Sequence, residues 1–406
     1  MQFKNLKRTA VLCMSLLILS GCGSAADAPA VTDEGTAETS AAEESASAEG
    51  STSAETDEAE GSATDYFDLE FHRGGRDARP ENTLYSYQYA LENGATTIEC
   101  DMQMTADGEI VLSHNGTLNP DITVDEDGNR VESGIRIDSL TLEELQKYNV
   151  GSMDPDSEYY ELHGQTQVQV DTCIPSLREL FDLVRESGND EVLFNIEIKS
   201  CPDPAMGEEQ TDEGDMEAIL DEFYSLVCEY DLKDRVCLQS FDWAMLVKMK
   251  EIDPSIKIAG LYSEEPDWGS ADATTLWLDR EEASPWLGGL NIHDYNDDPV
   301  ELAHALEIDM VSPYYTEITS EQVAKAHEYG MTVIPWTINS VDALKQVLQL
   351  GVDGAITDKP WELREYLLSE GYALPDTQTV DLPYHLDTDH VEVQTEGSSN
   401  GMDAAY

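Results

Sequence analysis

The sequence contains few positive charges. Its 22 Lys and Arg residues stand against 84 Asp and Glu, so the formal net charge is −62, and residues 9–72 contain no Lys or Arg. A chain this acidic cannot bind nucleic acid by charge attraction, which excludes nucleic-acid partners. Its field would also repel an anionic substrate, although salt screens that repulsion over roughly 10 Å. A site for such a substrate therefore needs a local positive charge, which a bound divalent cation would supply.

A hydrophobic run long enough to cross a membrane is missing from the N-terminal region. Three basic residues precede an apolar run at residues 10–19, and this run is well short of the roughly 20 residues that span a bilayer. The sequence Leu-Ser-Gly-Cys follows, ends at Cys22 and resembles the bacterial lipobox. We expect residues 1–21 to be a signal peptide and Cys22 to carry a lipid. The lipid would anchor the protein to the extracytoplasmic face of a bacterial cell membrane.

Cysteine is scarce and irregularly spaced. The chain has seven Cys, and no two of them form a C-x-x-C pair, so a zinc cluster or a dense disulfide framework is excluded. Cys13 belongs to the expected leader and Cys22 to the anchor. The other five leave room for one or two disulfides, which the sequence does not assign: Cys100, Cys173, Cys201, Cys228 and Cys237.

Composition divides the remaining chain into three parts. Residues 22–66 are mostly Ala, Ser, Thr, Gly, Glu and Asp without apolar periodicity. Such a segment buries too little surface to fold, so we predict a disordered acidic stalk. Residues 67–372 have the length and pattern of one large α/β domain. Residues 373–406 again lack Lys and Arg and form an acidic C-terminal tail.

Within the domain, strand and helix patterns alternate. This alternation predicts a (β/α)8 TIM-type barrel, whose active site lies at the C-terminal ends of the strands. Residues 115–173 interrupt it, with one short helix near 142–148, and we interpret them as an insertion after the second strand that caps the site. The expected strands are 68–73, 97–104, 109–114, 192–199, 235–240, 256–262, 308–313, 332–337 and 354–357, and the expected helices are 82–92, 176–186, 215–230, 242–252, 320–329, 341–350 and 361–368.

Closely spaced carboxylates on two of these strands indicate a metal site. Residues i and i+2 of a strand share a face, so Glu99 and Asp101 point the same way and Cys100 points oppositely. Two carboxylates facing a barrel interior are costly unless a cation lies between them. Glu197, on another strand, is a candidate third ligand, and Lys199 faces the same cavity. Oxygen ligands of this kind favour Ca²⁺ or Mg²⁺.

Two histidines are candidates for proton transfer. His72 and His114 fall at or near strand ends, where they would meet the carboxylates. Histidine is the side chain that titrates near neutral pH without large perturbation. For the other six histidines the sequence provides no functional argument.

Taken together, the motifs resemble the glycerophosphodiester phosphodiesterase family over roughly residues 68–370. The matching segments, in chain order, are His72-Arg73-Gly74, Pro80-Glu81-Asn82-Thr83, Asn93-Gly94-Ala95, Ile98-Glu99-Cys100-Asp101, Thr105-Ala106-Asp107-Gly108, Val111-Leu112-Ser113-His114, Ile174-Pro175-Ser176-Leu177, Asn195-Ile196-Glu197-Ile198-Lys199, Gln239-Ser240-Phe241, Trp336-Thr337-Ile338-Asn339 and residues 353–360.

The resemblance implies a role for each matching residue. A divalent metal would be held by Glu99, Asp101 and Glu197. His72 and His114 would act as acid and base, Arg73 and Lys199 would bind the phosphate, and Trp336 would pack against the glycerol or the leaving group, or else pack at the rim. The reaction implied is metal-dependent hydrolysis of a small glycerophosphodiester to glycerol 3-phosphate and an alcohol.

Departures and alternatives remain open at this point. Asn115 stands where the family usually has Asp, and Arg76 or Arg79 is an unusual addition near the phosphate pocket. Another substrate, either a glycerol-phosphate polymer such as teichoic acid or a lysophospholipid, would leave the chemistry unchanged. A noncatalytic binding lipoprotein on the same barrel predicts a missing ligand or histidine, and none is missing. Metal identity, headgroup and oligomeric state stay undetermined.

Overall fold

The structure is a computed structural model that describes residues 66–202, 216–264 and 274–388. The expected signal peptide, Cys22 and nearly all of the expected stalk lie outside these residues, as does the end of the acidic tail. Among the described residues, no helix combines the length and apolar character needed to cross a membrane.

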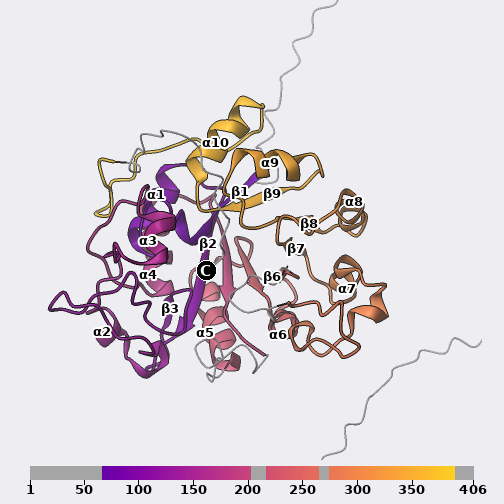
Figure 1. Ribbon diagram of the computed structural model, residues 1–406, viewed down its shortest axis with the longest axis horizontal. Helices are drawn as coiled ribbons and strands as arrows, with labels where there is room; N and C mark the ends of the chain where they lie inside the picture. The colour runs from indigo at the N-terminus through magenta and orange to yellow at the C-terminus, as the bar shows by residue number, and fades with distance from the viewer. Residues whose placement is uncertain (1–65, 203–215, 265–273, 389–406) are drawn as a thin grey trace, which may run out of the picture. The chain divides into compact units, whose positions relative to one another are not determined.

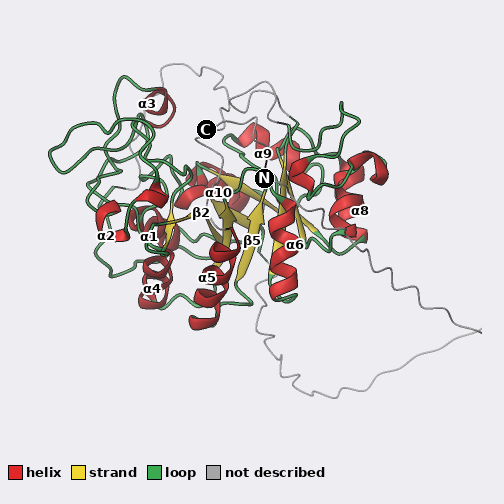
Figure 2. Cartoon of the chain, turned by 90° about the horizontal axis from the view of Figure 1, so that it is seen from below, coloured by secondary structure: helices red, strands yellow, loops and turns green. Residues whose placement is uncertain are grey.

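A barrel of parallel strands forms the centre of the domain, with helices around it (Figures 1 and 2). The strands pair in the order β8-β7-β6-β5-β4-β2-β1-β9. Their bounds are β1 Asp68–Phe71, β2 Thr97–Met104, β4 Leu193–Ile198, β5 Val236–Ser240, β6 Lys257–Tyr262, β7 Met310–Pro313, β8 Thr332–Val333 and β9 Gly354–Thr357. Near the two ends of this order, the N–H of Asp353 donates to Val333 (3.0 Å) and that of Ile338 to Ile356 (2.8 Å). The barrel is therefore nearly closed, and the predicted (β/α)8 fold is confirmed.

The helices begin where the sequence supplies caps. The Ser176 hydroxyl accepts from the Glu179 N–H, and Glu179 reaches back to Ser176, so α4 starts with a capping box. Thr83 does the same for α1 with Ser86. The α-helices are α1 Leu84–Glu92, α2 Leu142–Leu145, α3 Glu158–His163, α4 Leu177–Ser187, α5 Met216–Glu229, α6 Trp243–Ile252, α7 Pro299–Ala305, α8 Ser320–Glu328, α9 Val341–Leu348 and α10 Pro360–Ser369.

Strand β2 shows how the two faces of the wall differ. Ile98, Cys100 and Met102 belong to the main apolar core, whereas Glu99 and Asp101 alternate with them and are equally buried. Because successive side chains of a strand point to opposite faces, the carboxylates face the barrel interior. The predicted opposite orientation of Cys100 is thus confirmed.

Two strands of the barrel wall, β1 and β8, end at least two residues earlier than the sequence predicts. Strand β1 stops at Phe71 because a 3-10 helix, His72–Gly74, turns the chain at that point. Strand β8 covers only two residues of the predicted 332–337. Beyond it, Ile334 and Trp336 still donate singly to β7, but Pro335 has no N–H with which to continue the ladder.

The segment 109–114 forms a hairpin with β2 and is not one of the parallel strands of the barrel. Strand β3, Ile110–Leu112, pairs antiparallel with β2 at Met102–Met104. It leads into the insertion, which carries α2 and α3 on the same side of the barrel as α1 and α4 (Figures 1 and 2). Helix α3 was not predicted from sequence, and neither was α7. Both are short, and neither has a long apolar repeat.

A second small core joins the insertion to β3 and to Ile174, and hydrogen bonds tie the insertion to the barrel. The core residues are Val111, Leu118, Val131, Ile137, Leu145, Val150 and Ile174. Tyr159 donates its hydroxyl to Glu81 (2.8 Å) and Gln167 donates to the Arg76 carbonyl (2.6 Å). These bonds join the insertion to the loop that follows β1.

The described part of the C-terminal tail packs on α1. Leu374 and Val380 are buried in the main core. The Gln88 amide donates to the carbonyl of Val380 (3.1 Å) and accepts from the N–H of Tyr384 (3.0 Å). Among the described residues, Cys100, Cys173, Cys228 and Cys237 are free thiols.

Candidate active site

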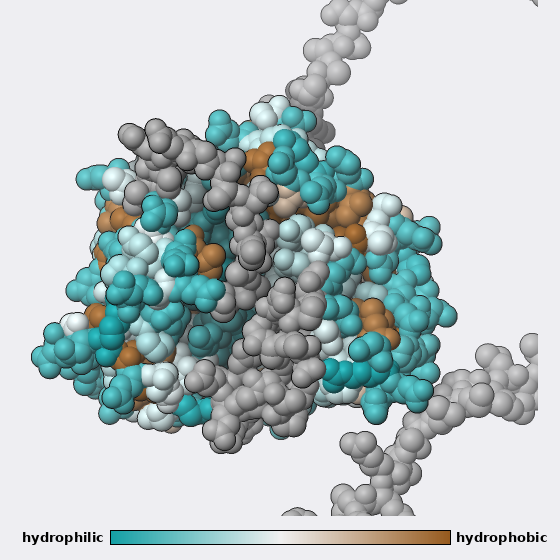
Figure 3. Space-filling view, in the orientation of Figure 1, coloured by the Kyte–Doolittle hydropathy of each residue, from teal (hydrophilic) through white to brown (hydrophobic). Residues whose placement is uncertain are grey.

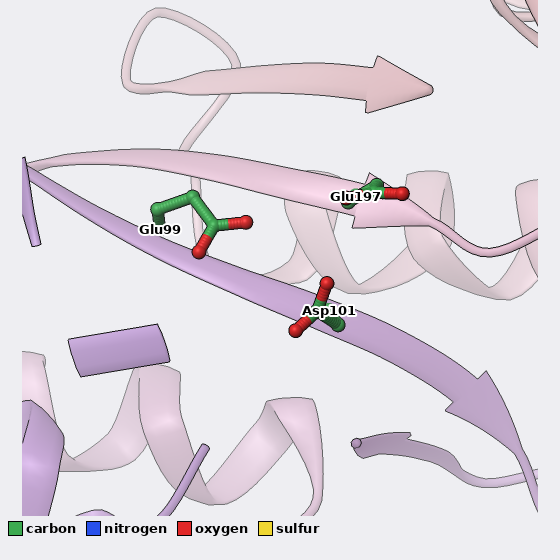
Figure 4. Close-up of side chains that lie close together, drawn as sticks. All are labelled: Glu99, Asp101 and Glu197. Atoms are coloured by element: carbon green, nitrogen blue, oxygen red, sulfur yellow. The ribbon is translucent and has the colours of Figure 1, made fainter. Parts of the chain in front are cut away.

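Three carboxylates meet inside the barrel at the C-terminal side of β2 and β4. Asp101 and Glu197 are register partners on these adjacent parallel strands, and Glu99 precedes Asp101 by two residues on the same face (Figure 4). One carboxylate oxygen from each residue lies within 4.8 Å of the others, and all three side chains are buried. The structure therefore brings together the three residues predicted to bind a metal.

Two cations compensate part of this negative charge. Lys199 Nζ lies 2.9 Å from Asp101 Oδ1 and 2.8 Å from Glu197 Oε1. Arg73 Nε lies 3.3 Å from Asp101 Oδ2, and its backbone N–H donates to Glu99 Oε2 at 2.8 Å. Both residues predicted to bind the phosphate thus lie against the carboxylates.

The three carboxyl groups respond differently to their surroundings. Burial, together with the neighbouring Asp101 and Glu197, raises the pKa of Glu99 well above its usual range. Burial also raises the pKa of Glu197 to about 7, although Lys199 opposes the rise. For Asp101, the charges of Lys199 and Arg73 overcome burial and hold the pKa well below normal. Two of the three groups hence favour the protonated form unless more positive charge is present.

A divalent cation fits this arrangement. The donors are three buried carboxylates on two strands, the hard oxygen ligands that Ca²⁺ and Mg²⁺ prefer. The raised pKa of Glu99 and of Glu197 is the electrostatic sign of a site with too little positive charge. Glu99, Asp101 and Glu197 would hold the cation, which would balance both groups in their ionised form.

An unusual backbone conformation aims Arg73 at this site. Arg73 has a φ of 52°, in the left-handed region that non-glycine residues seldom occupy. Gly74 follows with a φ of 80°, and a Cβ there would come within 2.4 Å of Ser86 Oγ. The turn lets the Arg73 N–H reach Glu99 while the side chain reaches Asp101 and Glu81. Backbone strain of this kind is typical of functional sites.

His72 is held by a carboxylate from the last barrel strand. Its Nδ1 lies 2.6 Å from Asp358 Oδ1, and its Nε2 lies 3.9 Å from Glu99 Oε2. Asp358 also accepts from Arg76 (2.7 Å) and Asn339 (2.7 Å). Because the carboxylate accepts the Nδ1 proton, Nε2 is left to exchange a proton at the site.

His114 is oriented by the residue that departs from the family pattern. Its Nδ1 lies 2.7 Å from the side-chain oxygen of Asn115, so the amide oxygen accepts the Nδ1 proton. The preceding Ser113 N–H donates to the Asp101 carbonyl (2.9 Å), which places His114 beside the carboxylates. The pKa of His114 is well below normal because of burial and the charges of Arg73 and Lys199.

The opposite half of the barrel interior is apolar. Trp336 packs with Leu261, Ile334 and Ile356, donates its indole N–H to the Ser312 carbonyl (2.9 Å) and is 7% exposed. Phe241 and Tyr314 meet its ring edge to face, with centroids 5.5 and 5.4 Å away. Trp336 is thus anchored among other side chains, and rim packing accounts for most of its surface.

Arg76 and Arg79, the two additional arginines, differ in position. Arg76 is buried against Asp358 and belongs to the group that holds His72. Arg79 donates to the carbonyls of Ala78 (3.0 Å) and Thr388 (2.5 Å) and lies over the Tyr89 ring. Arg76 is therefore linked to the site, whereas these contacts join Arg79 to the tail and α1.

Three supporting residues lie in motifs that the sequence displayed without revealing their roles. Asn82 donates to Asp101 Oδ2 (2.8 Å), and its Oδ1 accepts from the Tyr87 hydroxyl (2.9 Å). Gln239 donates to Glu99 Oε1 (3.1 Å). Asp358 holds His72. Gln239 lies within the last residues of β5 and Asp358 directly follows β9, a position that could have revealed both in a barrel with one catalytic rim. Asn82 lies in the loop before α1 and has no such signal.

A pocket opens beside His114. Its volume is about 360 Å³, part of it open to solvent. His114, Asn115, Glu81 and Asn82 form its polar side. Its apolar side is largely supplied by the insertion and includes Leu112, Leu118, Ile122, Val150 and Ile174.

Comparison with known proteins agrees with this geometry. Residues 72–362 match the Glycerophosphoryl diester phosphodiesterase family. A glycerophosphodiester phosphodiesterase of Caldanaerobacter subterraneus is 28% identical, over 71% of this chain and 93% of its own. A glycerophosphodiester phosphodiesterase of Bacillus subtilis is 26% identical, over 71% of this chain and 82% of its own. A crystal structure from Silicibacter pomeroyi, assigned to the glycerophosphoryl diester phosphodiesterases, has 27% identity and a TM-score of 0.63 over 75% of this chain and 94% of that one.

Proposed function

Because this chain belongs to the glycerophosphoryl diester phosphodiesterase family, we propose that it hydrolyses small glycerophosphodiesters to glycerol 3-phosphate and an alcohol, with a divalent cation. The observation that carries the proposal is the meeting of Glu99, Asp101 and Glu197 with Arg73 and Lys199. A phosphodiester is an anion, and these two cations are the positive groups that would receive it. A binding protein without catalysis would not need two oriented histidines beside them.

In the proposed reaction, His72 and His114 carry out two proton transfers. The glycerol hydroxyl next to the phosphate attacks phosphorus, and one histidine takes its proton at Nε2. The other histidine gives a proton to the leaving alcohol as its bond to phosphorus breaks. Water then opens the cyclic phosphate with the two roles exchanged, which yields glycerol 3-phosphate. His72 and His114 both have Nδ1 engaged, by Asp358 and Asn115, and so present Nε2.

Charge on the phosphoryl oxygens increases during attack. The Arg73 guanidinium and the Lys199 ammonium would bind these oxygens as fixed donors. The bound cation would supply further positive charge to the same oxygens. Lys199 presently contacts two carboxylates, and a cation among them would allow its ammonium to turn to the phosphate.

The pocket beside His114 favours a small alcohol over a polymer. The insertion forms much of its wall, with Leu118, Ile122 and Val150 facing the polar side. A glycerol-phosphate polymer or a lysophospholipid would have to continue past this wall.

Release of glycerol 3-phosphate from glycerophosphocholine tests the activity. We expect turnover with Mg²⁺ or Ca²⁺, loss of turnover with chelator and recovery when metal is returned. His72→Ala and Glu99→Ala should each lower kcat by roughly 10²-fold or more. Glu109→Gln, which changes a carboxylate outside the site, is the matched control and should keep full activity. Full turnover in chelator or in either site variant would rule out the mechanism, and turnover on polymer alone would select the other substrate.

A lipid anchor on Cys22 is the second part of the proposal. Its support is the order of basic residues, apolar run and Leu-Ser-Gly-Cys at residues 1–22. Expression of the full chain with a labelled fatty acid should label the wild type and leave Cys22→Ser unlabelled and released from membranes. A wild type that takes no label would rule out the anchor without affecting the catalytic proposal.

A further inference from the structure

Glu70 is a buried carboxyl that the reaction does not use. It lies on β1 two residues before His72, its side chain is fully buried, and it reaches Asn195 on β4 across the barrel interior. Within the described residues, no Lys, Arg or His forms an ion pair with it. A lone ionised carboxylate in such a place is very costly.

A chain of hydrogen bonds connects the proposed metal ligand Glu99 to Glu70. Glu99 Oε1 accepts from Gln239 Nε2 (3.1 Å), so the amide oxygen of Gln239 faces the other way. That oxygen accepts from Asn195 Nδ2 (3.0 Å). The same Nδ2 donates its second hydrogen to Glu70 Oε2 (2.8 Å). The orientation of both amides is thereby fixed, because reversing either would set two acceptors against each other.

Two atoms are left over at the end of this chain of bonds. Glu70 Oε1 and Asn195 Oδ1 are buried and have no hydrogen-bond partner in the described structure. Both are oxygens, and an ionised Glu70 has no hydrogen to share between them. A neutral carboxylic acid has one, since its O–H can donate to the Asn195 oxygen while its carbonyl oxygen accepts from Nδ2. One proton on Glu70 would therefore give both orphaned atoms a partner.

The charges facing Glu70 act in the same direction. Burial and the carboxylate of Asp68, on the same strand, raise the pKa of Glu70 well above its usual range, and only the Asn195 bond opposes them. Cys237, on β5, faces it as a thiol whose own pKa is raised well above normal by burial and by Glu70. Of the described groups that act on Glu70, the Asn195 amide is the one that favours the ionised form.

We propose that Glu70 is a permanently neutral carboxylic acid, paired with the Asn195 amide, and that this pair positions the metal ligand Glu99 through Gln239. The metal part of this inference rests on the proposed function, whereas the neutral acid–amide pair does not. Glu70 is a positioning residue that never meets the substrate. Its neutrality also matters, because another negative charge beneath three carboxylates would weaken the field of the bound cation.

Infrared difference spectra of the metal-free protein test the pair directly. Wild type minus Glu70→Gln at neutral pH should show the carbonyl stretch of a protonated carboxylic acid. Asn195→Ala should shift that band, because the acid loses its partner. A carboxylate band in place of the acid band would overturn the proposal. This result does not depend on any activity of the enzyme.

Calorimetric metal binding tests the positioning role. Glu70→Gln retains a donor toward the Asn195 oxygen and an acceptor toward its Nδ2, so metal affinity should match the wild type. Glu70→Leu breaks the chain of bonds and should weaken metal binding by roughly 10- to 100-fold. Gln239→Met should do the same without altering Glu70, which keeps the test valid if Glu70→Leu does not fold. Wild-type affinity in Gln239→Met would refute the positioning role.

Discussion

At the scale of single residues, the candidate site depends on hydrogen-bond partners that fix the orientation of its two histidines. His72 and His114 have equivalent first contacts, a carboxylate oxygen of Asp358 and an amide oxygen of Asn115. Each accepts the Nδ1 proton and leaves Nε2 to the site. Asn115 therefore retains the orienting function of the usual Asp and removes only its charge.

Replacing Asp358 by Asn should separate orientation from folding. Both oxygens of Asp358 accept from two donors, Oδ1 from His72 and Arg76 and Oδ2 from Arg76 and Asn339, so an amide nitrogen in either place would face donors. We expect His72 to lose its fixed tautomer and kcat to fall by roughly 10²-fold, while metal affinity changes little. Steady-state kinetics on glycerophosphocholine with saturating metal measure the loss.

A matched control lies at the other end of the same strand. Asp353 directly precedes β9, at the end of this strand opposite to Asp358. Its carboxylate lies 2.9 Å from the His327 ring nitrogen. Asp353→Asn should therefore alter stability without altering kcat per folded molecule. Equal kinetic losses in the two variants would mean that Asp358 acts only by holding the barrel together.

The cluster of three buried carboxylates was predictable from sequence, whereas its supporting residues were not. Glu99 and Asp101 obey the two-residue period of a strand, which is a local rule. Asp358 is 286 residues away from His72, and only the closed barrel brings them together. Glu70 gives no local signal either, because an acidic residue in a strand pattern is usually a surface residue.

At the scale of elements, agreement is best where one strand or helix follows one uninterrupted pattern. Strands β2 and β9 have the predicted bounds, and α8 ends one residue early. Strand β8 is shorter because Pro335 removes an N–H, and the short helices α3 and α7 escaped prediction. Their stability comes from caps and contacts with other elements, and seven residues or fewer hold too little periodicity to be recognised.

The N-terminal end of β1 makes a pH-dependent contribution that can be measured. Burial raises the pKa of Asp68 from 3.8 to about 6, with Asp353 adding to it, while the Thr97 hydroxyl (2.7 Å) and Lys257 oppose the rise. The folded state binds this proton more tightly than the unfolded state. The resulting stability is complete below about pH 4 and is lost as the pH rises through about 6.

The stability of the Asp68→Asn variant relative to the wild type should therefore increase as the pH rises. Between pH 4 and pH 7 the difference in free energy of unfolding should shift by roughly 2–3 kcal/mol in favour of the variant. Urea denaturation at both pH values measures this shift. Asp107→Asn provides a control of opposite sign, because the Thr105 hydroxyl lowers the pKa of that exposed carboxyl. A difference that does not vary with pH would show that folding does not raise the pKa of Asp68.

At the scale of the whole molecule, the charge imbalance has a kinetic consequence. The chain carries a net charge of −62, and hydrophilic side chains dominate the described surface in the view of Figure 3, with small separate hydrophobic patches. A substrate with net negative charge must cross this field before it reaches Arg73 and Lys199. A zwitterionic substrate of similar size experiences almost no net force.

Added salt should therefore raise kcat/KM for an anionic substrate and leave kcat/KM for a zwitterionic substrate unchanged. Raising the ionic strength from about 0.01 to about 0.15 M shortens the screening length from about 30 to about 8 Å. With metal saturating, kcat/KM for glycerophosphoglycerol, an anion, should rise severalfold, whereas kcat/KM for glycerophosphocholine, a zwitterion, should stay constant. Because both substrates meet the same site, their ratio cancels any effect of salt on the metal or on folding. A constant ratio would show that the positive groups at the site already outweigh the acidic surface at the distance where the substrate is captured.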